Sequence, residues 1–234
     1  MSAPNSTVSL ESLVKCPAKD SKFIHLLLNH RVQWHMMYCM LRSGQTKENS
    51  ASLNEMWAMY RLLFEIHSSV EEKEILPVLT SEAKSVVEKV HAEHEDLEKS
   101  LKEVDAAHHE SPEKFAEKLK IFASKYHNHT LMEERELIPA CQSLDPAKRD
   151  QMTLAIKNHF RAQKDSAWLI LSMRDVATFS GDTGLWNLSM PWFFRNVVAM
   201  FLSSNATYSK YSSLFPREAD EWLPKYAALL DVGK

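Results

Sequence analysis

Glycine is scarce in this chain of 234 residues, which has only 4 glycines and 3 cysteines. A β-sandwich or a nucleotide-binding α/β sheet of this size needs more glycine for turns and phosphate loops, so the shortage favours helices joined by few connections. Three cysteines without a Cys-x-x-Cys spacing indicate free thiols rather than a disulfide framework. A net charge of −3 argues against an electrostatic nucleic-acid binder.

Long hydrophobic runs are also missing. The N-terminal residues MSAPNST are polar and do not form the apolar segment of a secretory leader. The most hydrophobic later stretch, Pro191 to Leu202, is short and contains Arg195, so we do not expect it to span a membrane. We therefore expect a cytoplasmic protein that binds neither membranes nor nucleic acid. Histidine, in contrast, is abundant, with 11 residues.

Apolar residues recur with the 3.6-residue period of amphipathic helices after an irregular arm at residues 1–20. Long helices are expected at about 21–42, 52–76, 81–107 and 112–138. Ser111 is a good N-cap followed by Pro112, and Pro77 and Pro139 should end the second and fourth helices. The short connections predict an all-α fold, an up-down-up-down antiparallel four-helix bundle over residues 21–142.

Residues 145–234 are predicted to form a helical, aromatic-rich extension, because four of the six tryptophans lie there. One helix is expected at about 146–178, a second around Trp192, Phe193 and Phe194, and a last one around Trp222 and Tyr226. The segment is too apolar to be a free tail, so it should pack on the bundle. The cluster at 192–194 is either an anchor or the lid of an apolar substrate pocket.

An internal repeat ends the second and fourth helices. The segment HSSVEEKEILP at 67–77 aligns without a gap with HTLMEERELIP at 129–139, and the shared frame is His-x-x-x-Glu-Glu-x-Glu-x-x-Pro. Five identities at fixed spacing show that a two-helix unit has been used twice.

The repeated residues lie on the apolar faces of their helices. His67 and Glu71 are four residues apart, as are His129 and Glu133, so each pair occupies one face. His30 and His94 continue the apolar stripes of the first and third helices. An imidazole or a carboxylate on a core face is costly unless it is paired or binds a metal. These six residues are therefore the candidate ligands, and His91, three residues before His94, is an additional one.

Imidazoles and carboxylates that converge from the helices of a bundle suit two cations bridged by the glutamates. This donor set suits iron or manganese at least as well as zinc. The carboxylates of Glu72 or Glu134 are candidates to orient the imidazoles from behind.

The doubled motif and the two lone histidines resemble the haemerythrin-like, or HHE cation-binding, domain over about residues 21–142. The resemblance implies a four-helix bundle with a non-haem diiron centre, bridged by oxo or hydroxo, that reacts with O2. Carried onto this chain, it implies the ligands His30, His67, Glu71, His94, His129 and Glu133.

The chain departs from the oxygen-carrying members of that family. It has His129-x-x-x-Glu133 where the carriers have His-x-x-x-x-Asp, and His91-x-x-His94 where they have His-x-x-x-His. Four histidines and two bridging glutamates leave open positions, which favours an O2-activating oxidase or oxygenase. Its substrate would be a small apolar or aromatic molecule bound under the extension. The alternative is an O2-binding or iron-binding sensor or storage module without turnover.

Other histidines are expected to have ordinary roles. His25, His35 and His127 fall off the apolar stripes and should be solvated or capping residues. His159 is expected at the surface of the extension, with a role near the site as its alternative. Tyr126, one turn before His129, is either a packing residue or a hydrogen-bonding residue of the site.

Overall fold

The computed structural model describes residues 23–44, 50–163, 167–180, 186–187, 205–216 and 222–230. Within these ranges the chain is helical and contains no strand, which confirms the all-α prediction for the described residues. Among the described helices, none combines the length and apolar character needed to cross a bilayer.

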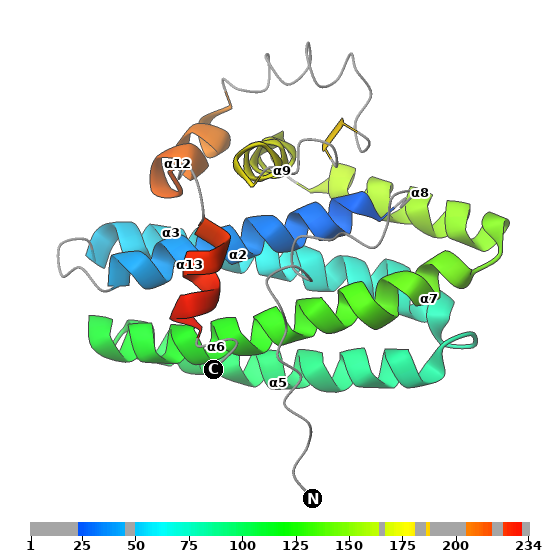
Figure 1. Ribbon diagram of the computed structural model, residues 1–234, viewed down its shortest axis with the longest axis horizontal. Helices are drawn as coiled ribbons and strands as arrows, with labels where there is room; N and C mark the ends of the chain where they lie inside the picture. The colour runs from blue at the N-terminus through cyan, green and yellow to red at the C-terminus, as the bar shows by residue number, and fades with distance from the viewer. Residues whose placement is uncertain are drawn as a thin grey trace, which may run out of the picture.

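The long helices of the N-terminal part lie alongside one another in Figure 1. They are α2 (Ile24–Gly44), α3 (Ser50–Val70), α5 (Lys84–His108) and α6 (Pro112–Met132). Helix α2 packs against α3 and α6, and α5 packs against α6. The apolar stripes read from the sequence face this core, where Phe122, Leu119 and Tyr126 are fully buried.

The start of α6 follows the predicted chemistry. Ser111 has extended backbone angles, and its hydroxyl accepts a hydrogen bond from the Lys114 backbone N–H at 3.2 Å. Pro112 occupies the first turn, where its missing N–H leaves no bond unmade. The same device starts helix α8 (Pro146–Ala162), where Asp145 Oδ1 accepts from the backbone N–H groups of Ala147 and Lys148.

The expected helix ends at Pro77 and Pro139 are wrong. Helix α3 continues through a π-helical segment, η1 (Glu71–Ile75), into α4 (Leu76–Leu79), which contains Pro77. Helix α6 likewise continues through η2 (Glu133–Leu137) into α7 (Ile138–Ser143), which contains Pro139. A proline lacks an N–H and clashes with the carbonyl four residues earlier. The wider π turn relieves both constraints, so the helical path passes each proline.

The extension is divided differently from the prediction. The single helix expected at 146–178 is two helices, α8 and α9 (Ala167–Phe179), because the chain becomes extended at Gln163. Helix α12 (Ala206–Leu214), which the sequence did not suggest, follows, and α13 (Trp222–Leu229) lies where the last helix was expected. The helix expected around Trp192, Phe193 and Phe194 lies outside the described residues.

The extension helices cover one side of the long helices. Helices α9 and α13 contact α2, α12 contacts α9 and α3, and α8 contacts α3 and η1. Figure 1 shows α13 crossing from α2 toward α6. Trp168, Trp222 and Tyr226 of the extension share one buried apolar cluster with Trp34 and Tyr126. The extension therefore forms part of the core, although its boundary near residue 145 stays a prediction.

Two histidines that were expected in solvent are buried by this packing. His35 lies against Phe179 and Trp222, with ring centroids 4.7 and 5.2 Å apart. His127 lies between Trp34 and Tyr226, at 4.6 and 5.7 Å. Burial lowers the pKa of His35 to about 3 and that of His127 to about 4, so both are neutral at neutral pH. The prediction failed because His35 and His127 lie off the apolar stripes of α2 and α6, on faces that residues of the extension cover.

Replacing Trp222 with alanine should lower the free energy of unfolding by about 3–5 kcal/mol, because the side chain is almost fully buried between α2 and α9. Chemical denaturation measures the change. Leu62→Ala is the control, since Leu62 is 44% exposed and should change stability by no more than about 0.5 kcal/mol. Equal effects of the two variants would contradict the assignment of α13 to the core.

Candidate metal centre

The two His-x-x-x-Glu pairs sit where the α-helices widen into π turns. Glu71 is the first residue of η1, and Glu133 is the first residue of η2. In each segment the sixth residue closes the wide turn: Leu76 N–H bonds to the Glu71 carbonyl, and Ile138 N–H bonds to the Glu133 carbonyl. π turns are rare and are frequent at functional sites, and here both begin at a candidate ligand.

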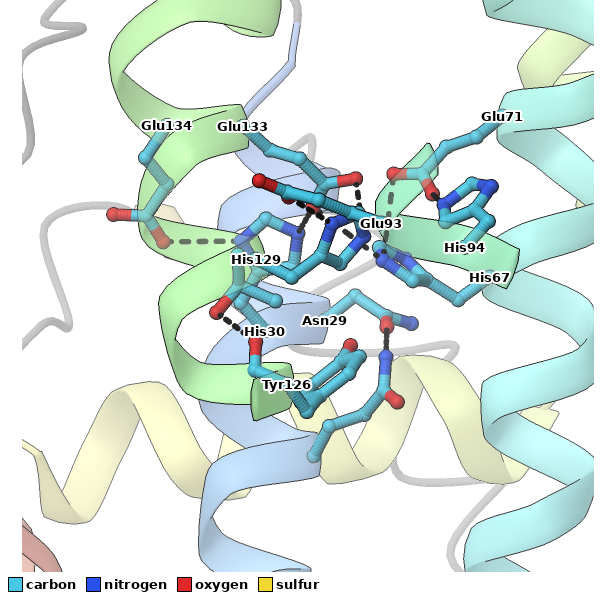
Figure 2. Close-up of polar contacts among 12 residues, drawn as sticks. Asn29, His30, His67, Glu71, Glu93, His94, Tyr126, His129, Glu133 and Glu134 are labelled. Carbon is cyan, nitrogen blue, oxygen red and sulfur yellow. Dashed lines mark hydrogen bonds and ion pairs between the residues drawn. The ribbon is translucent and has the colours of Figure 1, made fainter. Parts of the chain in front are cut away.

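The six candidate residues come together inside the molecule. Figure 2 shows the imidazoles of His30, His67, His94 and His129 turned toward the carboxylates of Glu71 and Glu133. His30, Glu71 and Glu133 are fully buried, His67 and His129 nearly so, and the His94 side chain is 12% exposed. The sequence placed them on four helices, and the structure brings those four faces to one point.

Each glutamate divides its two oxygens between two histidines. Glu71 Oε1 lies 3.3 Å from His67 Nε2, and Glu71 Oε2 lies 3.3 Å from His94 Nε2. Glu133 Oε1 lies 3.0 Å from His129 Nε2, and Glu133 Oε2 lies 3.1 Å from His30 Nε2. In both carboxylates, therefore, one oxygen faces the pair His30 and His67, and the other oxygen faces the pair His94 and His129.

The geometry defines two groups of ligand atoms that share both glutamates. The first group, which we call the inner position, consists of His30, His67, Glu71 and Glu133. The second group, which we call the outer position, consists of His94, His129, Glu71 and Glu133. Within each group the ligand atoms lie within 4.8 Å of one another. Each position therefore offers two imidazoles and two bridging carboxylates to a cation.

Carboxylates on the far side of the rings hold three of the four imidazoles. Nδ1 of His30 lies 3.0 Å from Glu134 Oε1, and Nδ1 of His94 lies 2.6 Å from Glu72 Oε1. Nδ1 of His129 lies 2.9 Å from Glu93 Oε2. A ring that donates its Nδ1–H to a carboxylate leaves the Nε2 lone pair for a metal.

Glu72 and Glu134 were expected in this role, but Glu93 was missed. Glu93 lies on α5 and its partner His129 lies on α6, 36 residues later. No local spacing links them, so only the packing of α5 on α6 reveals the contact. The position of Glu93, one residue before the ligand candidate His94, was the available signal.

Inward-facing polar atoms provide a test of whether these residues fit a metal. Among the described residues, Nε2 of His30, His67 and His94 and all four carboxylate oxygens of Glu71 and Glu133 are buried without a hydrogen bond, and the imidazoles and carboxylates face one another only in ion-pair contacts. Leaving one buried polar group unsatisfied costs about 1–3 kcal/mol, and more if it is charged. Such a concentration of nitrogen and oxygen donors fits a pair of cations of the kind that imidazole and carboxylate bind.

The additional candidate His91 lies apart from both positions. Its side chain is 50% exposed, and its Nδ1 contacts Glu72 at 3.2 Å. His159 of the extension is closer to the site than its expected surface position suggested. Its Nδ1 lies 2.9 Å from Glu74 Oε1, so α8 is tied to the π turn that begins at Glu71.

Comparison with known families decides the class of this domain. Residues 26–141 match the family model described as Hemerythrin HHE cation binding domain. This segment belongs to that family. The predicted resemblance over about 21–142 is thereby confirmed, and the segment is a helical cation-binding module. No curated protein and no solved structure matches the chain at a significant level.

Protons compete with cations in this HHE domain. Burial opposes the charge of His30, but Glu133 and Glu134 outweigh it and raise its pKa to about 9. Burial also opposes the charge of His129, but Glu133 and Glu93 raise its pKa to about 10. Contact with His129, His30 and His67 holds the pKa of Glu133 well below its ordinary value despite burial. The glutamates are thus ready as anions, while two imidazoles must lose protons before they can bind a metal.

Cation binding to the HHE domain should release protons and strengthen as the pH rises. Because the pKa values of His30 and His129 are about 9 and 10, both rings are protonated at neutral pH, and acid should weaken binding further. Isothermal titration calorimetry in buffers of different ionisation enthalpy counts the released protons. An affinity independent of pH between about 6 and 9 would contradict the assignment of these two rings as ligands.

Proposed function

We propose that residues 26–141 form an up-down-up-down four-helix bundle that holds two non-haem iron ions. O2 reacts at this centre, and the protein is an oxidase or oxygenase of a small molecule. The observation that carries the proposal is the sharing of Glu71 and Glu133 between the inner and outer positions. Two carboxylates that each serve two neighbouring positions are suited to a pair of cations rather than to one.

The donor set supports iron above the alternatives. Each position has two imidazoles and two carboxylates, a mixed nitrogen and oxygen set that suits iron, whereas zinc in structural sites prefers a closed tetrahedron with sulfur or nitrogen. Four side chains leave open positions on an ion that takes about six ligands. Iron bound there would supply the electrons that reduce O2.

The protein's own groups hold the imidazoles and limit water. Glu134, Glu72 and Glu93 fix three rings from behind. The Tyr126 ring lies 6.2 Å from the rings of both His67 and His129 and is fully buried. Burial, together with Tyr60, Glu133 and Glu71, raises the pKa of Tyr126 well above its ordinary value, so its hydroxyl keeps its proton. Among the described residues this hydroxyl has no hydrogen-bond partner.

An apolar cavity beside the centre supports access for a small apolar molecule. Its volume is about 20 Å³, more than the roughly 10–15 Å³ that a water-sized molecule needs. It lies between α2, the first π turn and the extension helix α8, and its lining is mainly apolar, including Leu26, Val70, Ile75, Ile156 and Phe160. Val70 directly precedes Glu71, and Ile75 ends the π turn that Glu71 begins, so the cavity reaches this turn, although none of the six candidate ligands lines it. Its size suits a diatomic gas, and α8 forms its outer wall.

The decisive experiment is metal analysis of anaerobically purified protein, followed by optical spectra through one cycle of O2 addition. The proposal expects two irons per chain and an absorption change on mixing with O2 that decays faster when an oxidisable compound is present.

Glu133→Gln removes the charge shared by both positions and should lose both ions, whereas Glu136→Gln, on the exposed side of the same π turn, should retain them. A stable, reversible spectral change without turnover would favour the O2-binding module instead. Absence of iron would refute the proposal.

Filling the cavity should slow the reaction with O2. Ile156→Trp places a large ring in the cavity wall and is expected to lower the second-order rate constant by about tenfold. Leu154→Trp is the matched control, since Leu154 lies on the same helix and is 56% exposed. Stopped-flow mixing of the iron-loaded variants with O2 measures both constants. Equal rates for the two variants would show that O2 reaches the centre by another route.

A further inference from the structure

The inner and outer positions share both glutamates but differ in the groups behind their histidines. Behind the outer position stand two carboxylates, Glu72 at 2.6 Å from His94 and Glu93 at 2.9 Å from His129. Each is partly exposed, at 37% and 32% of its side chain. Neither contact involves an arginine or a lysine, although Glu72 also lies 3.2 Å from Nδ1 of the half-exposed His91. Each carboxylate therefore contributes its negative charge to the outer position.

The inner position has one carboxylate behind it, and that carboxylate is paired with a cation. Glu134 lies 3.0 Å from His30 and also accepts two hydrogen bonds from the Arg31 guanidinium, at 3.2 and 3.3 Å. Arg31 is itself buried, with its guanidinium carbon 4.1 Å from the centre of the Trp34 ring. Arg31 therefore cannot swing into solvent without losing this contact. The positive charge of Arg31 therefore offsets the negative charge of Glu134.

The internal repeat shows which residue breaks the symmetry. Glu93 directly precedes His94, and the residue that directly precedes the matching lone histidine, His30, is Asn29. Asn29 is fully buried, and its side-chain oxygen already accepts a hydrogen bond from Gln33 at 2.7 Å. Within the described part of the chain, His67 Nδ1 has no hydrogen-bond partner, whereas Nδ1 of the matching His129 has Glu93. A neutral amide thus stands where the second half has a carboxylate.

We propose that these groups make the two positions inequivalent, and that a divalent cation fills the outer position before the inner one. Glu93 and Asn29 are the residues that set this order. The inference rests on the proposed two-ion centre. Apart from the two shared glutamates, the outer position has the two negative charges of Glu72 and Glu93. The inner position has one negative charge, Glu134, and one positive charge, Arg31, which sum to zero.

Burial reinforces the same order. The side chains of His30 and His67 are at most 1% exposed, whereas His94 is 12% exposed and its partner Glu72 is 37% exposed. Removing a cation from water is costly, and the cost is smaller where solvent and uncompensated carboxylates are near. An ion that arrives from solvent therefore meets the outer position with the stronger attraction and the smaller desolvation.

The test is a titration of the whole ion-free chain with Mn²⁺, followed by electron paramagnetic resonance, and a parallel titration with diamagnetic Zn²⁺, followed by NMR of the histidine rings. Below one equivalent of Mn²⁺, the spectrum should be that of isolated Mn²⁺ ions. In the Zn²⁺ titration, the ring signals of His94 and His129 should shift before those of His30 and His67. At higher Mn²⁺ concentrations the spectrum of a magnetically coupled pair should replace the first one.

Matched variants assign the order to the proposed residues. Glu93→Gln should weaken the first binding step by about 10–100-fold, the usual effect of removing a carboxylate behind a ligand. Glu95→Gln changes the same charge on an exposed part of the same helix and should leave both steps unchanged. Asn29→Asp should strengthen binding at the inner position. Because Asn29 is buried, Asn29→Asp could prevent folding, and in that case the Glu93→Gln variant alone decides the test.

Several outcomes would overturn the inference. One such outcome is an equal affinity of the two positions, with the coupled-pair spectrum present from the first additions of Mn²⁺. Another is an earlier shift of the ring signals of His30 and His67 in the Zn²⁺ titration. Identical titrations of the Glu93→Gln and Glu95→Gln variants would remove Glu93 from the mechanism. If no second ion bound at any concentration, the two-ion proposal would fail, and the rings whose signals a single Zn²⁺ ion shifts would still decide which position is favoured.

Discussion

The structure depends on two buried carboxylates that four imidazoles share. Glu71 and Glu133 are fully buried, and a lone carboxylate in such a place would be protonated or would destabilise the fold. Each is acceptable because histidines from two sides approach its two oxygens. The long helices must therefore keep a fixed register relative to one another, since a shift of one turn in any helix would leave charges unpaired.

Much of this arrangement could be predicted from the sequence, and the failures have identifiable physical causes. The doubled motif and the lone histidines revealed the six clustered residues, because helical periodicity places them on core faces. The π turns were missed because a proline such as Pro77 or Pro139 ordinarily ends a helix, so the prolines were interpreted as helix ends. Glu93 and the buried ring of His127 were missed because their partners lie on other helices, so only tertiary packing reveals them.

The two π turns explain how the repeat can place ligands in both halves alike. Each begins at the glutamate of a His-x-x-x-Glu pair and ends two residues before a proline. The proline favours the wide turn by preventing regular α-helical bonding at its own position. The motif thus encodes a ligand pair together with a local backbone geometry, and the shared proline is part of the signature for that reason.

The packing of the extension into the same apolar core as the long helices has a thermodynamic consequence. Tyr226 and Trp222 belong to the same apolar cluster as Trp34 and Tyr126, and Tyr126 packs directly on two of the clustered histidines. We therefore expect the extension and the long helices to unfold as one cooperative unit. A cation that binds only the native state adds its binding free energy to the stability of that whole unit. A cation held by the clustered residues would consequently stabilise α13 as strongly as the helices that bear the histidines.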